Sequence, residues 1–142
     1  MKKIWLSLAI LLLILISFSL YWRSTVDATG GIQVVSAENE EHFTLRKLAK
    51  FETAKIVLAR ESEEDYQGFK LQKLLETMAV EDFRSVIISS TDGLSVSLKP
   101  TELSNAYLCL RQDNDQQYYQ LVISTDAFMQ RWLKYINRIE IR

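Results

Sequence analysis

An uncharged apolar run over residues 4–22 constrains this 142-residue chain more than any other feature. Its 19 residues are interrupted only by three serines, and as a helix they are long enough to cross about 30 Å of hydrocarbon. Lys2 and Lys3 precede the run, Arg23 ends it, and the Gly30-Gly31 pair follows shortly after. Since the run has no polar face, a helix packed in a soluble core is a poor interpretation. The sequence predicts a signal or membrane-spanning helix and argues against a cytosolic enzyme.

Residues 1–30 are open to two interpretations, a cleaved signal peptide or an uncleaved membrane anchor. The run exceeds the roughly 7–15 apolar residues of a typical signal peptide. Leu20, Tyr21 and Trp22 are bulky and suit a membrane interface, so both points favour an anchor. The small residues around Ala28 instead resemble a cleavage site. Under either interpretation residues 31–142 are periplasmic or exported, and an uncleaved helix would tether them to the inner membrane through residues 4–22.

Residues 31–142 are expected to form one folded domain. They carry 14 lysines and arginines and 17 acidic residues, so this part lacks the basic surface that nucleic-acid binding requires. A chain of this length folds without disulfides or metal ions. The only cysteine is Cys109 and the only histidine is His42, which excludes an intrachain disulfide and the usual zinc-ligand sets. We therefore expect no metal ion and no nucleic-acid partner.

The apolar periodicity of this part predicts an α+β domain with a mixed, mostly antiparallel sheet and short helices. Strands are expected at residues 32–35, 54–59, 85–90, 94–98, 107–110, 119–123 and 138–142. Helices are expected at residues 43–51, with Thr44 as the N-cap, at residues 71–78, and after Pro100. Asp92 and Gly93 predict a hairpin turn. The acidic group at residues 38–41 is interpreted as a solvated turn, and residues 128–133 as a helical turn.

The sequence contains few residues in arrangements that are typical of catalysis. His42 lies among acidic residues without a second imidazole, and Cys109 lies inside an apolar run, which is typical of a buried thiol. The four glycines form no phosphate-binding loop. We therefore assign no catalytic residue.

One segment combines cations with aromatic rings: Phe128, Arg131, Trp132, Lys134, Tyr135 and Arg138. Such a group can bind an anionic or planar aromatic ligand by charge and by stacking. In the other interpretation, Trp132 fills the core while Arg131 and Lys134 face water. The spacing alone leaves both interpretations open.

The order of several motifs resembles the oxidoreductase molybdopterin-binding domain, which has the sulfite-oxidase-type fold. Residues 66–76 (YQGFKLQKLLE) resemble its "Y-x-G-v-x-L-x-x-L-L" signature, and residues 87–98 resemble its hairpin around Asp-Gly. Residues 128–141 resemble its closing segment, with Arg131 and Lys134 on basic positions. The resemblance extends over residues 43–142.

The resemblance implies a particular branch of that family. In the enzymes, a cysteine in a longer N-terminal half ligates molybdenum, and that half is missing here. The chain is similar to the short exported branch, some members of which bind pterins. Those members work beside an inner-membrane protein that makes or degrades cyclic di-GMP. The resemblance thus implies a non-catalytic exported module with a pterin-like ligand, an inner-membrane signalling partner and no resident cofactor. Two alternatives remain: a molybdopterin-dependent oxidoreductase domain or subunit, and a ligand-free structural interaction domain.

The resemblance also implies a set of ligand-binding residues. Trp132 would stack on the flat pterin ring, next to Phe128. Arg131 and Lys134 would contact a carboxylate or phosphate on the ligand's tail. Asp92 would pair with the 2-amino edge of the pterin, although the same residue is also expected in a type I′ turn.

Overall fold

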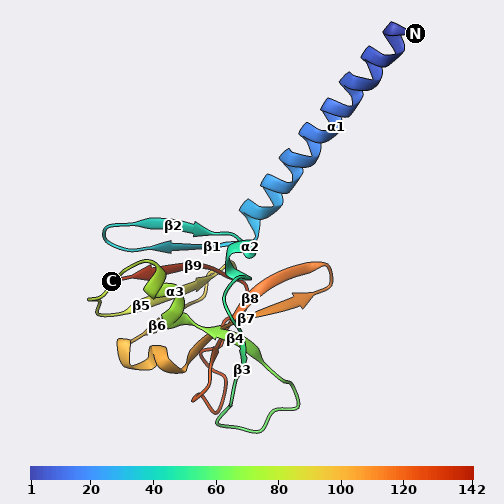
Figure 1. The fold of residues 1–142 in the computed structure, drawn as a ribbon. Coiled ribbons are helices and arrows are strands. Elements are labelled where there is room, and N and C mark those ends of the chain that lie inside the picture. Colours follow the sequence, from blue (N-terminus) through green and yellow to red (C-terminus); the bar gives the residue numbers. More distant parts are fainter.

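The apolar run forms α1 (Lys2–Thr29), which projects from the rest of the molecule in Figure 1. The computed structural model describes the backbone of residues 1–142 and the side chains of residues 1–22 and 30–142. The span Lys2–Trp22 is long and apolar enough to cross a membrane, and none of it is buried against the domain. α1 is thus compatible with either a signal sequence or a membrane anchor. The candidate cleavage site at residues 26–28 lies outside the residues with described side chains.

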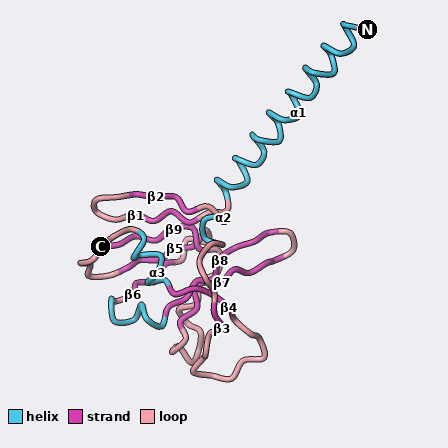
Figure 2. Tube along the Cα trace, in the orientation of Figure 1, coloured by secondary structure: helices cyan, strands magenta, loops and turns pink.

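The first of two sheets has the strand order β2-β1-β9-β5-β6. Its strands are β1 (Ile32–Val35), β2 (Glu40–Phe43), β5 (Val86–Ser90), β6 (Ser95–Leu98) and β9 (Ile136–Ile141). β1 and β9 are parallel, and every other pair in this sheet is antiparallel. The C-terminal strand therefore lies at the centre of the sheet, between the first strand and the β5–β6 hairpin (Figure 2).

The second sheet is antiparallel throughout, with the order β3-β4-β7-β8. Its strands are β3 (Ala54–Lys55), β4 (Gln67–Lys70), β7 (Ala106–Asp113) and β8 (Gln116–Ile123). Three short helices connect the strands: α2 (Leu45–Leu48), α3 (Leu71–Thr77) and the 3₁₀-helix η1 (Pro100–Asn105). The Thr44 hydroxyl caps α2 by accepting a hydrogen bond from the Lys47 amide, as the sequence predicts.

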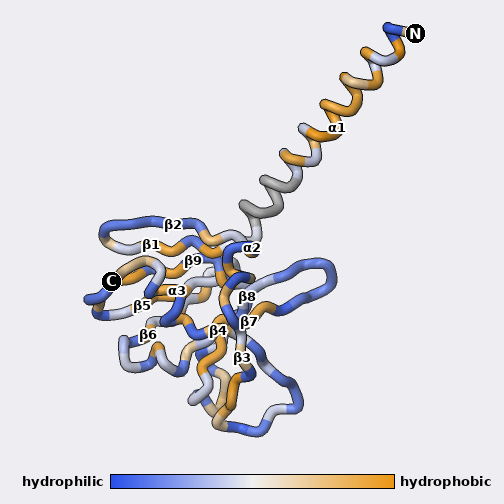
Figure 3. Tube along the Cα trace, in the orientation of Figure 1, coloured by the Kyte–Doolittle hydropathy of each residue, from blue (hydrophilic) through white to orange (hydrophobic). Residues whose placement is uncertain are grey.

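The main core involves both sheets and α3, and Figure 3 shows its apolar residues along the central strands. It contains fully buried side chains such as Leu74, Ile88, Leu121 and Ile139. Strand side chains alternate between the two faces of a sheet. On β7 and β8, the inner face that joins this core therefore carries Leu108 and Leu121, which are opposite each other in the register.

A smaller cluster packs on the other face of β7 and β8. This outer face carries Tyr107, Cys109, Arg111, Tyr118, Gln120 and Val122, as the register dictates. Ile56, Tyr66, Leu58 and Trp132 pack against its apolar members. They come from two irregular segments, residues 56–66 and residues 124–135, which Figure 1 places at the end of the domain away from α1. Thus loops, and not a second sheet, cover the outer face.

The predicted α+β class with a mostly antiparallel arrangement is confirmed, although the strands form two sheets instead of one. The hairpin around Asp92 and Gly93 is also confirmed. Only Gly93 of the pair has a positive φ, of 81°, and its amide bonds the Ser90 carbonyl at 3.1 Å. The type I′ turn expected at Asp92 is therefore wrong, because that turn requires a positive φ at both central residues.

Three local expectations are also wrong. The acidic segment expected as a turn includes β2, an edge strand whose charged residues face solvent while Phe43 is buried. The strand expected at residues 54–59 is only Ala54–Lys55, since the chain then leaves the ladder to cover the outer face. Residues 128–133 form irregular turns and no helix, with a φ of 55° at Met129.

Candidate functional site

A pocket of about 340 Å³ opens on the outer face of the second sheet. This volume lies at the lower end of the range of small-molecule sites. β7 and β8 contribute one polar side chain each, and the two covering loops contribute the others. The outer-face pocket is lined by Glu64, Tyr66, Arg111, Gln120, Met129, Trp132 and Lys134.

The base of the outer-face pocket holds an amide that lacks a protein partner. Gln120 is 6% exposed and is one of two buried polar residues among the described side chains. Its side chain makes no hydrogen bond with any other group that the structure describes. Among the described residues no fully buried side-chain nitrogen or oxygen lacks a partner, so the Gln120 amide reaches solvent through the pocket and is available to a molecule that enters it. A molecule that enters the pocket would supply that partner.

One wall of the outer-face pocket is a network of Glu64, Tyr66 and Arg111. The Arg111 guanidinium donates to a Glu64 carboxylate oxygen at 2.8 Å, and the Tyr66 hydroxyl donates to the same oxygen at 3.1 Å. Arg111 also lies over the Tyr66 ring, 4.9 Å from its centroid. The hydrogen bonds from Tyr66 and Arg111 hold the pKa of Glu64 below its usual value. Burial, and then the adjacent Glu64 carboxylate, raises the pKa of Tyr66, which stays neutral.

Trp132 forms the aromatic part of the outer-face pocket and is held in place on two sides. Its indole N–H donates to the Ile123 carbonyl at 3.1 Å. Its ring meets the Tyr66 ring edge to face, with the centroids 5.2 Å apart and the planes at 82°. Trp132 is half-buried and packs against both hydrophobic clusters. It therefore combines the two roles that the sequence left open, since it fills the small cluster and also lines the pocket.

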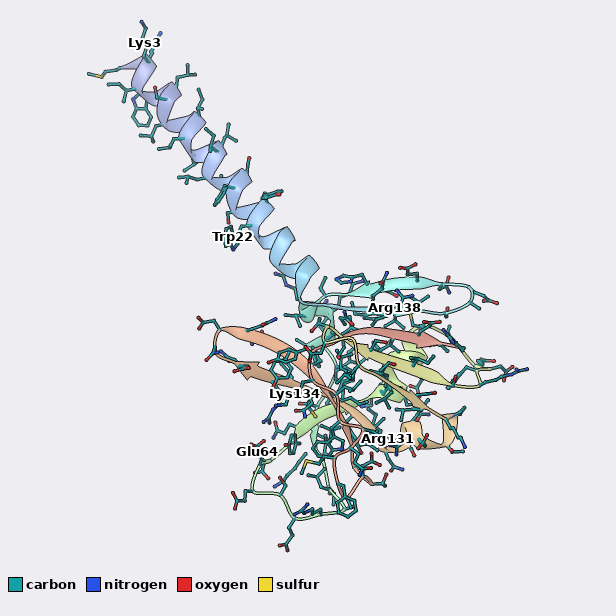
Figure 4. All side chains as sticks on the ribbon, turned by 180° about the vertical axis from the view of Figure 1, so that it is seen from behind. Lys3, Trp22, Glu64, Arg131, Lys134 and Arg138 are labelled. Carbon is teal, nitrogen blue, oxygen red and sulfur yellow. The ribbon has the colours of Figure 1, made fainter. Side chains whose placement is uncertain are left out.

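Lys134 is the exposed cation of the outer-face pocket. Its side chain makes no ion pair within the part of the chain that the structure describes, although its charge helps to lower the pKa of Glu64. Figure 4 shows Lys134 and Glu64 on the same side of the domain. With Arg111 and Lys134 against one carboxylate, the pocket carries a net positive charge, which favours an anionic ligand.

Arg131 lies outside the outer-face pocket, and its charge is neutralised. Its guanidinium forms a bidentate pair with Asp126, at 2.7 and 2.9 Å, and donates to Glu102 at 2.6 Å. These hydrogen bonds, those to Asp126 first and the one to Glu102 second, raise the pKa of Arg131 further above its already high value. Arg131 thus ties residues 124–135 to η1, and this role suits a positioning residue better than a ligand contact.

The other predicted ligand residues lie apart from the outer-face pocket. Phe128 is 78% exposed and lines a separate hollow of about 220 Å³ with Arg131. Asp92 is exposed in the β5–β6 turn of the first sheet and lines neither hollow. Arg138 lies on β9, where it donates to the Gln33 side chain at 3.3 Å (Figure 4). Of the five predicted ligand residues, only Trp132 and Lys134 line the outer-face pocket, whereas Phe128 and Arg131 share the separate hollow.

The sequence interpretation missed Glu64, Tyr66, Arg111 and Gln120. One signal was present for Gln120, because it interrupts the apolar run of residues 118–123. A polar residue on the buried face of a strand requires a partner, and this makes it a candidate for function. Their proximity, however, depends on the β7–β8 register and on the path of the covering loops.

Cys109 does not fit the role of a molybdenum ligand. It is 1% exposed on β7, and burial raises the pKa of its thiol to about 12. A Cβ built on Gly68 would lie 2.8 Å from the Cys109 sulfur, so β4 closes over it. Among the described side chains, no group of three or more His, Cys, Asp or Glu residues is placed to hold a metal ion.

Neither a scan against models of known protein families nor a search of the curated proteins gives a match to this chain. The resemblance to the sulfite-oxidase-type fold therefore stays a prediction.

Proposed function

We propose that this chain is a non-catalytic binding module, exported or held at the outer surface of the inner membrane by α1. It takes a flat, pterin-like ligand in the outer-face pocket. The observation that carries the proposal is the Gln120 amide, which has no protein partner and faces the pocket beneath an aromatic and cationic opening. A polar side chain positioned in this way inside a concave site is typical of ligand recognition.

The chemistry of a pterin matches the groups in the outer-face pocket. Its ring is planar, which suits contact with Trp132 and Tyr66. The edges of the ring carry adjacent hydrogen-bond donors and acceptors, and the Gln120 amide can both accept and donate. The Glu64 carboxylate can accept from ring N–H groups. This assignment transfers the role first suggested for Asp92 to Glu64, which lies in the pocket.

Aromatic residues at both ends of the apolar run support the retained anchor over the cleaved signal. Trp5 and Trp22 are about 25 Å apart along a helix, close to the thickness of the hydrocarbon layer. Trp22 also contacts Phe18, with ring centroids 6.0 Å apart. Aromatic residues at both interfaces are typical of membrane-spanning helices. A tethered module would lie beside an inner-membrane signalling partner, which the resemblance suggests makes or degrades cyclic di-GMP.

Calorimetric titration of the full chain in detergent micelles with 7,8-dihydrobiopterin tests the proposal. We expect saturable binding of one ligand per chain. Gln120→Leu should weaken it at least tenfold, because the ring would lose its partner at the base of the outer-face pocket. Gln117→Leu is the matched control, since Gln117 is exposed on the same strand and lies outside the pocket. Absence of saturable binding, or an equal loss in both variants, would refute the proposal.

A second candidate function is an interaction domain without a ligand. It is favoured by two exposed apolar side chains on the covering loops, Val57 at 88% and Phe128 at 78%. Co-purification of membrane partners with the full chain distinguishes the two. This candidate would be favoured if Gln120→Leu leaves the recovery of a partner unchanged and the Val57→Ser, Phe128→Ser double variant abolishes it.

A further inference from the structure

The outer-face pocket separates its polar groups by depth. Gln120 is 6% exposed, whereas the Arg111 and Glu64 side chains are 31% and 62% exposed, and Lys134 is exposed. The neutral amide therefore lies at the base, and all three charged groups lie toward the opening. A ligand that pairs with both layers must carry uncharged hydrogen-bonding groups at one end and a charged group at the other.

The charged layer is incompletely paired. Arg111 carries five N–H donors, and the hydrogen bond to Glu64 uses only its Nη2. Lys134 makes no ion pair with the described residues. Arg111 and Lys134 can thus hold an anionic group together while the Glu64 pair stays intact. Lysine and arginine hydrogen bonds to an anion are about twice as strong as neutral ones, so this group would dominate the choice of ligand.

The base layer has different requirements. A primary amide presents one carbonyl acceptor and two N–H donors, so it pairs best with a ring edge that carries an N–H beside a carbonyl. An isolated charge there would be poorly solvated, because Val122 and Cys109 surround this part of the outer face and both are buried. The anionic end of a ligand is therefore excluded from the base.

Resting on the proposed function, we infer that the outer-face pocket selects an acidic ligand, a planar heterocycle that carries a carboxylate or phosphate. The amide-like edge of the ring binds Gln120, and the anionic group binds Lys134 and Arg111 at the opening. Lys134 is thus the specificity-determining residue of the pocket, because it is the cation whose charge no described side chain neutralises.

A matched set of ligands tests this inference in the full chain in detergent micelles. The ligands are 6-hydroxymethylpterin, 6-carboxypterin and 6-hydroxymethylpterin diphosphate, which share a ring and differ in the charged substituent. Titration calorimetry at about 50 mM salt should give at least tenfold tighter binding of an acidic ligand than of the neutral one. The two acidic ligands decide between carboxylate and phosphate.

Two lysine variants locate the selectivity. Lys134→Ala should reduce the preference for an acidic ligand to threefold or less, because it removes the unneutralised charge at the opening. Lys73→Ala, which removes an exposed lysine from α3, should leave the preference intact. Gln120→Leu should weaken all three ligands by a similar factor, since it removes the contact to the shared ring.

The outcomes separate this inference from the proposed function. Equal affinity for the neutral and acidic pterins would overturn the acidic-ligand inference and leave the binding function standing. An equal loss of preference in Lys73→Ala and Lys134→Ala would also overturn it, because the effect would then reflect net charge alone. If none of the three pterins binds, the proposed function and the inference both fail.

Discussion

The two faces of β7 and β8 differ in what their side chains do, although they are formed by alternating residues of the same two strands. On the inner face, Leu108 and Leu121 are fully buried in the main core. On the outer face, Arg111 and Gln120 alternate with them and line a pocket. Strands point successive side chains to opposite faces, so one hairpin supports the core and a binding site at once. Stability and recognition are therefore separable by single substitutions one residue apart.

The two faces differ because of what covers them. The inner face joins a core formed with the first sheet and α3, whose apolar side chains pack without a charged group. The outer face is covered by residues 56–66 and 124–135, which mix apolar with charged side chains and leave the pocket between them. A face covered by loops accepts variation in shape and polarity, and binding sites concentrate on such segments.

Leu121→Ala should have the largest effect on stability, because it opens a cavity in the main core. Burial of Leu121 at 0% exposure predicts a loss of about 2–5 kcal/mol in the free energy of unfolding. Urea unfolding followed by circular dichroism of the full chain in micelles measures it. A loss below about 1 kcal/mol would contradict the proposed difference between the faces, because the inner face would then contribute no more to the free energy of unfolding than the outer face.

Arg131→Ala should have an intermediate effect, and one that appears on the outer face. Loss of the links to Asp126 and Glu102 should cost about 1–2 kcal/mol, because these charges are only partly screened by solvent. Residues 124–135 would loosen, and the ligand should dissociate faster. Arg131→Lys should recover the stability only in part, since lysine cannot form the bidentate contact. Unchanged ligand dissociation in both variants would show that Arg131 does not position this loop.

Gln120→Leu should leave the free energy of unfolding unchanged, or raise it by less than about 1 kcal/mol, while it weakens ligand binding. The substitution removes an amide that has no protein partner and reaches solvent through the pocket, and it places an apolar side chain beside Val122. Gln117→Leu, on an exposed position, should change the free energy of unfolding by less than about 0.5 kcal/mol. The two effects are measured on the same preparations by urea unfolding and calorimetry. A loss of stability in Gln120→Leu would indicate that the amide has a structural role instead.

The pH dependence of stability should include a small contribution from Glu102. A backbone hydrogen bond from Lys99 and the Arg131 pair hold its pKa below the ordinary 4.5. A lowered folded pKa gives stability that is present above pH 4.5 and is lost as the pH falls through the folded value. Glu102→Gln should therefore reduce the loss of unfolding free energy below pH 4.5 by a few tenths of a kcal/mol. This change would appear as a shallower decline in melting temperature with falling pH. An unchanged pH dependence would mean that Glu102 is solvated in the folded state and does not hold residues 124–135 through Arg131.

Elements with a strong local signal were predicted from the sequence. The α1 run, the helix near Leu71 and the Asp92-Gly93 hairpin each depend on residues close in the chain. β2 was missed because an exposed edge strand shows charge instead of alternation, and only its pairing with β1 makes it a strand. Of the site, Trp132 and Lys134 were predicted from their chemical type. Arg131 was placed in the ligand site because its two carboxylate partners, Asp126 and Glu102, are not apparent as neighbours in the sequence.

By itself, the sequence determined the division into an apolar N-terminal helix and an α+β domain, because hydrophobic run length and periodicity are local properties. Only the tertiary structure decided which charges are neutralised and which remain available. Arg131 and Lys134 are three residues apart, yet one is held between two carboxylates and the other stands at the opening of a pocket. The reason is physical: the free energy of a charge depends on the groups within a few ångströms of it, and here several of those groups, such as Glu102, Glu64 and Arg111, come from distant parts of the chain.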